Sequence, residues 1–383
     1  MARLPARCLL FVCATLTACT APAQPPPPVP SAPPPAAKTE PAPIRAAPTR
    51  PAQLWPFTKF RGTDYVSVRD IAKRYGLKAA WTKPGAMMTL SDARGVRIAF
   101  EKDQPDFYLD GTRVFLGELT YLSGDSLWVT KLDVIKTVAP LFQPADHLAF
   151  LPATPLKIIV LDPGHGGTDP GKQNLRLKLD EKDMALDVAL RLKKILEEHG
   201  YRVVMTRTTD KRSSNSPAID LPWRAEIANK ESADLFLSIH FNAIDHDMDR
   251  VVGTETYVFT PQFQVSTQPE RDKTMIKEQY PGNRHDVANV VLGYALHHRL
   301  ISDLKTSDRG YKRYRLAVLR TLNCPGVLVE CAYLSNDAEA RRVATPEFRQ
   351  QIAEALAAGV QDYSATLAAL RPTPPPAKPQ TSP

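Results

Sequence analysis

Residues 157–167 read Lys-Ile-Ile-Val-Leu-Asp-Pro-Gly-His-Gly-Gly, and this stretch decides the expected fold. The apolar run 157–161 predicts a buried strand. From here to about residue 368, predicted strands alternate with predicted helices. Alternation of this kind predicts an α/β fold with a mostly parallel sheet that is flanked by helices on both faces.

The helices of this region carry recognisable ends. The first, from Glu181 to His199, has apolar residues at three- and four-residue steps along one face, and Gly200 closes it. The last begins at Thr345-Pro346, a capping residue followed by proline at the first helical position. Further helices are expected at 223–230 and 286–304, and further strands at 201–205, 235–239, 254–260, 317–319 and 327–329.

Four chemically active side chains follow the ends of these strands. His165 comes after strand 157–161, His240 after 235–239 and Glu330 after 327–329, while Glu181 opens the helix that follows the first strand. The carboxyl ends of parallel strands meet at one edge of a sheet, so we expect these residues to converge. Two histidines and one glutamate can form a three-ligand zinc site with an open position, and a further carboxylate can act as general base.

Each of these residues also has a purely structural interpretation. His165 could be a turn histidine, His240 a buried strand-end histidine and Glu330 an ordinary strand-end charge. A lone histidine between glycines after an apolar strand is poor core material, and Glu330 follows three apolar residues and needs a partner. We therefore favour the functional interpretation for these three. Glu181 taken alone is better explained as a favourable carboxylate in the first turn of a helix.

The segment 57–150 predicts a small α+β domain. Short strands bounded by turns are followed by helical stretches at 69–76 and 131–140, and residues 67–73 and 130–136 form a faint internal repeat. The segment resembles the domain first named from the N-terminus of copper amine oxidases. Its sequence has no cluster of histidine, cysteine or carboxylates at ligand spacing, so we interpret it as a spacer or wall-docking domain.

The charge of the chain is concentrated outside the main domain. The net charge of +8 suggests at first a nucleic-acid binder, but residues 151–370 hold 29 basic and 29 acidic residues. Fourteen prolines in 20–56 and six in 371–383 predict a linker and a disordered tail. Nucleic acid is therefore not an expected partner.

The N-terminus predicts export. A basic start, an apolar run of about ten residues and Leu-Thr-Ala-Cys19 resemble a bacterial lipoprotein signal, 1–19, in which Cys19 carries the lipid. An ordinary cleaved signal is the alternative. We expect an envelope or periplasmic protein that is anchored to a membrane through Cys19. Cys324 and Cys331 are separated by an apparent strand, which holds them too far apart for a disulfide, so we expect two free buried thiols.

The region from 156 to 363 resembles the zinc-dependent N-acetylmuramoyl-L-alanine amidases of the amidase-3 type, which are cell-wall hydrolases. The shared motifs are the stretches around the four candidate residues together with 204–210, 224–229, 308–310 and 318–320. The resemblance implies that His165, Glu181 and His240 hold Zn²⁺ and that Glu330 is the catalytic glutamate. Phe241 in place of alanine, and Ala332-Tyr333 in place of Gly-Phe, depart from the family pattern and leave substrate detail open.

The resemblance also implies the reaction. Glu330 would take a proton from a zinc-activated water and return it to the leaving amine, as the amide between N-acetylmuramic acid and L-alanine in peptidoglycan is cleaved. Two alternatives are a zinc amidase of the same fold that acts on free muropeptides and a non-catalytic wall-binding protein. The sequence identifies no protein activator.

Two further features have no assigned function. The polar stretch 261–285 could cover the cleft or restrain activity, since long loops are often functional. His285, His297 and His298 are also candidates for metal binding, but we favour solvated surface positions for the last two, which lie on adjacent faces of the expected helix.

Overall fold

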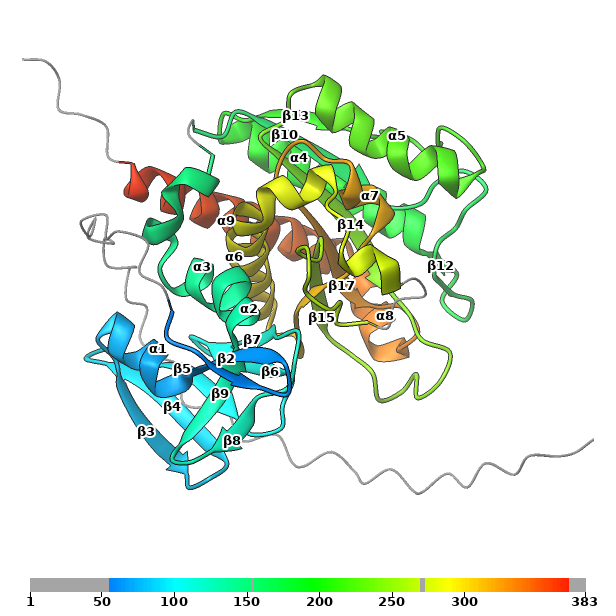
Figure 1. Cartoon of the computed structure of the whole chain (residues 1–383). Coiled ribbons are helices and arrows are strands. Elements are labelled where there is room, and N and C mark those ends of the chain that lie inside the picture. The colour runs from blue at the N-terminus through cyan, green and yellow to red at the C-terminus, as the bar shows by residue number, and fades with distance from the viewer. Residues whose placement is uncertain (1–54, 153–154, 269–272, 372–383) are drawn as a thin grey trace, which may run out of the picture. The chain divides into compact units, whose positions relative to one another are not determined.

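The strand expected at 157–161 is β10 (Ile158–Pro163), and it lies within an 11-stranded mixed sheet (Figure 1). The computed structural model describes residues 55–152, 155–268 and 273–371. The sheet order is β13-β10-β14-β17-β15-β16-β7-β6-β5-β4-β3. The strands β13, β10, β14 and β17 are parallel, β15 is antiparallel to β17, and β16 is parallel to both β15 and β7. A sheet flanked by helices confirms the α/β fold class.

The main domain contains most of the helices. Its strands are β10, β11 (Gln173–Asn174), β12 (Leu179–Asp180), β13 (Arg202–Met205), β14 (Leu235–Asn242), β15 (Thr254–Val258), β16 (Asp308–Arg313) and β17 (Gly326–Tyr333). Its helices are α4 (Glu181–Glu198), α5 (Pro217–Lys230), α6 (Asp286–Leu304), α7 (Ala317–Arg320), α8 (Asp337–Ala344), α9 (Pro346–Leu370) and the short 3-10 turns η3 (Lys273–Ile276) and η4 (Pro281–His285).

The central strands are apolar on both faces. Ile159 and Leu237 belong to a buried cluster with residues of α4, α6 and α9, whereas Val160 and Phe236 point to the other face and belong to a cluster with residues of α5 and α7. Successive residues of each strand point to opposite faces of the sheet, and helices cover both faces (Figure 1). This burial explains why the strands read as continuous apolar runs.

The segment that we call the N-terminal module, residues 57–150, contributes to two sheets. A four-stranded sheet has the order β1-β2-β9-β8, and β3 to β7 extend the large sheet, where Val114 of β7 pairs with Tyr311 of β16. Its elements are β1 (Thr58–Phe60), β2 (Thr63–Ser67), α1 (Val68–Tyr75), β3 (Lys78–Lys83), β4 (Met87–Asp92), β5 (Gly95–Glu101), β6 (Asp106–Leu109), β7 (Thr112–Phe115), β8 (Tyr121–Ser123), β9 (Ser126–Thr130), α2 (Lys131–Asp133), η1 (Val134–Val138), α3 (Ala139–Phe142) and η2 (Pro144–Phe150).

The internal repeat of the module corresponds to a repeated strand–helix unit. Ser67 ends β2 and caps α1 by accepting a hydrogen bond from the backbone of Arg69, and Thr130 ends β9 and caps α2 by accepting one from Asp133. The two strands are antiparallel neighbours in the small sheet. The hydroxyl at each repeat start is therefore a helix cap, which satisfies a backbone N–H that has no partner within its helix.

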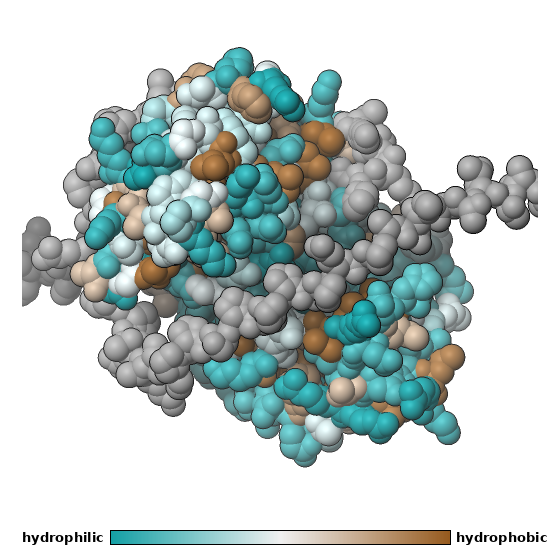
Figure 2. Space-filling view, turned by 90° about the horizontal axis from the view of Figure 1, so that it is seen from below, coloured by the Kyte–Doolittle hydropathy of each residue, from teal (hydrophilic) through white to brown (hydrophobic). Residues whose placement is uncertain are grey.

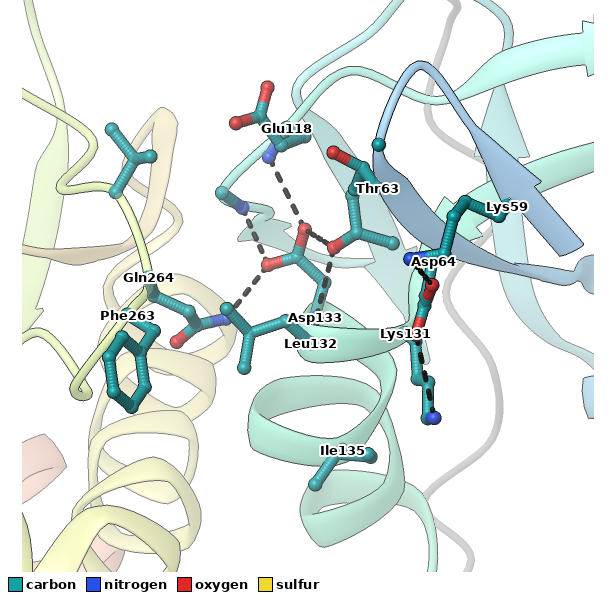
Figure 3. Close-up of a pocket in the computed structure, with 14 residues that line it drawn as sticks. Lys59, Thr63, Asp64, Glu118, Lys131, Leu132, Asp133, Ile135, Phe263 and Gln264 are labelled. Atoms are coloured by element: carbon teal, nitrogen blue, oxygen red, sulfur yellow. Dashed lines mark hydrogen bonds and ion pairs between the residues drawn. The ribbon is translucent and has the colours of Figure 1, made fainter. Parts of the chain in front are cut away.

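Asp133 also joins the module to the stretch that follows β15. Its buried carboxylate accepts hydrogen bonds from the backbone of Gly117 (2.7 Å) and from Thr130 Oγ1 (2.7 Å). It also accepts one from Gln264 Nε2 (2.8 Å), which Figure 3 shows. These residues line a cavity of about 520 Å³. Gln264 thus contacts the module, while 269–272 lie outside the described residues. Whether the 261–285 segment regulates activity stays a prediction.

Several expectations concern residues that the structure does not describe. The signal segment, Cys19, the proline-rich linker up to residue 54 and the tail from residue 372 all lie outside the described ranges. Within those ranges, no helix is long and apolar enough to cross a membrane. On the face shown in Figure 2, hydrophobic residues form small separate patches between hydrophilic ones.

One prediction about elements is wrong, and another gave a helix that is too short. Residues 317–319, expected as a strand, form helix α7, whose Val318 and Leu319 pack into the same cluster as α5. Three apolar residues cannot distinguish a strand from a helical turn by their pattern. The helix expected at 223–230 is longer, since α5 begins at Pro217 with Ser216 in the N-cap position.

The surface positions expected for His297 and His298 are also wrong. His297 is fully buried, and its ring nitrogens contact Thr256 Oγ1 (3.0 Å) and Asp308 Oδ1 (2.9 Å). His298 is half-buried against Thr112 of the module. Helix α6 is packed on more than one side, so adjacent helical positions both lie inside. Cys324 and Cys331 are free and buried, as predicted.

A buried carboxylate connects β15, β16 and β17. Glu255 is 1% exposed and accepts hydrogen bonds from Lys312 Nζ (2.7 Å), Arg309 Nε (3.0 Å) and the hydroxyls of Tyr257 (2.7 Å) and Tyr333 (2.8 Å). Burial alone would raise the pKa of Glu255, but the charge of Lys312 and these hydrogen bonds lower the pKa to about 2. The ionised form of Glu255 therefore stabilises the fold.

We expect Glu255→Gln to destabilise the protein by ~3 kcal/mol at pH 7, because Lys312 loses its buried counter-charge. The contribution of ionised Glu255 is complete above its unfolded-state pKa of ~4.3 and is lost as the pH falls towards the folded-state value. The difference in the free energy of unfolding, measured in urea, should therefore shrink between pH 5 and pH 3. The exposed Glu198→Gln serves as control. A difference independent of pH would contradict this account.

Candidate metal centre

A buried carboxylate near the end of β10, that of Asp162, holds the strand end from which the next loop begins. Asp162 accepts hydrogen bonds from Thr206 Oγ1 (2.6 Å), Ser238 Oγ (2.7 Å) and Arg224 Nη1 (2.8 Å). Burial would raise the pKa of Asp162, but the charge of Arg224 outweighs it and lowers the pKa. The end of β10 is therefore fixed to β14 and α5 by an ionised group.

Two arginines hold the backbone carbonyls of the same loop. Arg224 donates to the carbonyls of Pro163 (2.9 Å) and His165 (2.8 Å), and Arg207 donates to those of Pro163 (3.0 Å) and Gly164 (2.8 Å). His165 has a φ of +60°, in the left-handed region that disfavours residues with a Cβ atom. The arginine contacts stabilise this unusual backbone and so fix the direction of the imidazole.

Three of the predicted residues meet at this loop. One ligand atom from each of His165, Glu181 and His240 lies within 4.8 Å of the others. His165 Nε2 is 3.1 Å from Glu181 Oε2, and His240 Nδ1 is 2.8 Å from Glu181 Oε1. His165 comes from the loop after β10, His240 from β14 and Glu181 from the first residue of α4. These three side chains therefore lie together, as the positions of the strand ends in the sequence predicted.

Two glycines make this close approach possible. A Cβ atom on Gly164 would lie 2.3 Å from the His240 ring, and one on Gly171 would lie 2.6 Å from Glu181 Oε2. Neither distance is compatible with a side chain. Gly164 and Gly171 thus allow the side chains of the site to pack closely against the backbone.

Glu181 is the most buried of the three and has the most fixed position. Besides the two histidines, its carboxylate accepts hydrogen bonds from the backbone of Lys172 (2.7 Å) and Phe241 (3.0 Å). Burial would raise its pKa, but the hydrogen bonds from His165 and His240 outweigh this and hold the pKa of Glu181 well below its usual range. The group is therefore an anion at neutral pH.

Asp169 contacts the outer side of one imidazole. Its Oδ2 is 3.0 Å from His165 Nδ1 and 3.3 Å from Arg212 Nη1. A carboxylate in this place fixes the tautomer and orientation of a ligand histidine and leaves Nε2 free for a metal.

Glu330 lies beside the cluster without joining it. On β17 it is the register partner of His240 on one side and of Glu255 on the other. Its Oε2 is buried and has no hydrogen-bond partner among the described residues. Burial raises its pKa, and the negative charges of Glu181 and Glu255 raise it further. An unpaired carboxyl group beside a cluster of candidate metal ligands is suited to proton transfer.

The donor set fits zinc. Two imidazole nitrogens and one carboxylate oxygen are the ligands of a catalytic zinc site with an open position, and Asp169 supplies the outer carboxylate that such histidines contact. A cavity of about 300 Å³ reaches both imidazoles and has an apolar wall formed by Leu221, Leu316 and Val318. This arrangement has room for a substrate group beside the candidate metal position.

Sequence reasoning did not assign a role to the supporting residues. Asp162, Arg207 and Arg224 are as buried as the core, yet in the sequence they look like ordinary charges. One local signal exists, since Asp220 and Arg224 have the four-residue spacing of a helical ion pair and their side chains are 2.7 Å apart. The carbonyl contacts of the arginines have no sequence signal at all.

Comparisons with known proteins concern the segment that carries this candidate site. A family model described as N-acetylmuramoyl-L-alanine amidase matches residues 159–362. The germination-specific N-acetylmuramoyl-L-alanine amidase of Bacillus subtilis is 31% identical over 216 residues, which are 54% of this chain and 79% of that protein. The amidase AmiC of Escherichia coli is 32% identical over 234 residues, which cover 56% of this chain and 54% of that protein.

Two further similar proteins are a longer relative and a solved structure. A cell wall amidase of Bacillus anthracis is 32% identical over 208 residues, and this chain spans 35% of its length. The solved amidase AmiC2 of Nostoc punctiforme has 31% identity and a TM-score of 0.43, with 54% of this chain and 96% of that chain covered. Since the family model matches more than half of the 383 residues, the chain belongs to the N-acetylmuramoyl-L-alanine amidase family.

Proposed function

We propose that this protein hydrolyses the amide bond between N-acetylmuramic acid and L-alanine in peptidoglycan, with zinc held by His165, Glu181 and His240. The observation that carries the proposal is the convergence of these three ligands within 4.8 Å, beside the unpaired carboxyl of Glu330. The named relatives and the family model support the choice of substrate bond.

The mechanism assigns separate tasks to the chain's own groups. When bound, zinc supplies Lewis-acid chemistry that activates water and polarises a carbonyl. Glu330 takes the proton from the attacking water and returns it to the leaving amine of L-alanine. Its raised pKa suits a group that must hold this proton between the two steps. Asp169 keeps His165 in the tautomer that presents Nε2 to the metal.

Two other functions are possible for such a site. A zinc amidase of the same fold could act on free muropeptides, and a wall-binding protein could use the fold without catalysis. The second alternative gives no reason for an unpaired buried carboxyl at Glu330 beside three converging ligands. The first differs only in substrate size.

We also propose a place and an organisation for the protein. Residues 1–19 act as a lipoprotein signal, Cys19 carries the lipid, and the proline-rich residues 20–56 tether residues 151–370, the catalytic domain, to the membrane. The N-terminal module acts as a spacer or docks to the wall. We propose that it is similar to the domain first named from the N-terminus of copper amine oxidases. The tail 371–383 has no proposed role.

Digestion of peptidoglycan sacculi tests the reaction directly. The full-length protein loaded with zinc should release intact stem peptides with a free L-alanine N-terminus and leave glycan strands without peptides, as identified by mass spectrometry. A chelator should abolish the release. Hydrolysis of soluble muropeptides with untouched sacculi would favour the first alternative, and products cut at another bond would refute the proposed reaction.

The variant Glu330→Gln tests the proton carrier. It should retain one zinc per chain by metal analysis, because Glu330 is not among the proposed ligands. Its kcat should fall at least ~10³-fold, since general acid–base catalysis contributes up to ~10⁴-fold. The exposed Glu198→Gln serves as the matched control and should keep full activity. Unchanged turnover in Glu330→Gln would exclude this role.

A further inference from the structure

A third cavity, of about 280 Å³, lies at the junction of β7 and β16. Four cationic side chains line it, Arg113 from the N-terminal module, Arg250 from the segment before β15, and Arg309 and Lys312 from β16. The only acidic residue in its wall, among the described residues, is Asp308. We call this cavity the cationic pocket.

The carboxylate of Asp308 already has partners. Its Oδ1 contacts His297 Nε2 (2.9 Å) and the backbone N–H of Gly310 (2.8 Å), and its Oδ2 accepts from the backbone N–H of Arg113 (2.8 Å). These contacts draw Asp308 towards α6 and the backbone. It is not a dedicated counter-ion for the four cations.

In two of the four cations, both terminal guanidinium nitrogens are unused in the part of the chain that the structure describes. The contacts of Arg309 go through Nε, to Glu255 (3.0 Å) and to the hydroxyl of Tyr333 (3.1 Å), so that its two terminal nitrogens have no hydrogen bond within the described residues. The guanidinium of Arg250, which is exposed, has no partner there either. The pocket therefore presents free N–H groups of two guanidiniums.

The other two cations are anchored but add to the positive potential. Lys312 Nζ is 2.7 Å from Glu255, and Arg113 Nε is 2.9 Å from Asp106. Burial lowers the pKa of Lys312, the charge of Glu255 opposes this shift, and the charges of Arg309 and Arg113 add to the lowering. The like charges thus repel one another, and a bound anion would relieve this repulsion.

Tyr333 connects the pocket to the candidate active site. The position departs from the phenylalanine of the family pattern, and its hydroxyl contacts Arg309 and Glu255 while its ring lies 5.0 Å from the Arg309 guanidinium. Glu255 is in turn the register partner of Glu330. The pocket and Glu330 are therefore on the same edge of the sheet, two strands apart.

The separation matches a short peptide. Two steps between neighbouring strands are ~10 Å. An extended peptide covers ~3.3 Å per residue, so three residues span this distance. The peptide that leaves in the proposed reaction carries at least its C-terminal carboxylate, and arginine is the preferred partner of carboxylates because its planar fork donates two parallel hydrogen bonds.

We propose that the cationic pocket binds a carboxylate of the substrate's stem peptide, about three residues from the bond that is cleaved. The inference rests on the proposed amidase function and adds a substrate subsite to it. Arg250 and Arg309 contact the carboxylate, and Arg113 makes the N-terminal module part of the substrate site. The module then has a function in catalysis beyond spacing or wall docking.

The test compares two substrates, an N-acetylmuramoyl-tripeptide prepared from peptidoglycan and the same compound with all peptide carboxylates converted to carboxamides. With the zinc-loaded full-length protein, amidation should raise KM ~10-fold and leave kcat nearly unchanged, because the lost contact is remote from the reacting bond. Arg250→Ala should raise KM ~5–10-fold for the acid and leave KM for the amide unaffected. Arg341→Ala, an exposed arginine of α8, is the matched control.

The possible outcomes distinguish a failure of the proposed carboxylate subsite from a failure of the proposed amidase reaction. Equal KM for acid and amide, or an equal loss on both substrates in Arg250→Ala, overturns the cationic pocket and leaves the amidase function intact. Absence of cleavage of both substrates overturns the proposed function and the subsite with it. The comparison of substrates needs no variant, so it stands even if Arg250→Ala folds poorly.

Discussion

The buried ion pair between Asp162 and Arg224 is the contact on which the candidate site depends. Its carboxylate and guanidinium are 2.8 Å apart at 1% and 3% side-chain exposure, and Arg224 also donates to two carbonyls of the loop that carries His165. Removing either partner leaves a buried charge unpaired, which typically costs ~3–5 kcal/mol. Through its carbonyl contacts Arg224 holds the loop in which His165 has a left-handed backbone conformation, and the His165 ring lies beside Glu181 and His240.

A second buried charge, Glu255, organises the other side of the site. Its hydrogen bonds connect β15, β16 and β17 and include those from Arg309 and Lys312. Glu255 is also the register partner of Glu330 on the neighbouring strand. The same carboxylate therefore affects the pKa of the proposed proton carrier and positions the cations that we assign to the substrate's peptide. Since β7 of the N-terminal module pairs with β16, the module extends the sheet of residues 151–370 and does not merely precede it.

The sequence indicated the candidate metal ligands more readily than the residues that hold them in place. Apolar strands that end in His165, His240 and Glu330 indicate one sheet edge, because side chains at parallel strand ends must meet there. Glu181 needed the family resemblance, since a glutamate in a first helical turn has an ordinary explanation. Arg207, Arg224 and His297 could not be predicted, because their burial depends on contacts with carbonyls and side chains from distant strands. Helix α7 was missed since four residues carry too little pattern.

We propose that the three converging side chains form a zinc site on which cleavage of the N-acetylmuramoyl–L-alanine bond depends. The most direct measurement is a titration of metal-free protein with zinc, in which newly exposed N-terminal L-alanine of peptidoglycan is quantified at each step. We predict no release without metal and a linear rise that ends at one zinc per chain. Full release by the metal-free protein, or a rise that ends at any other stoichiometry, would contradict the account.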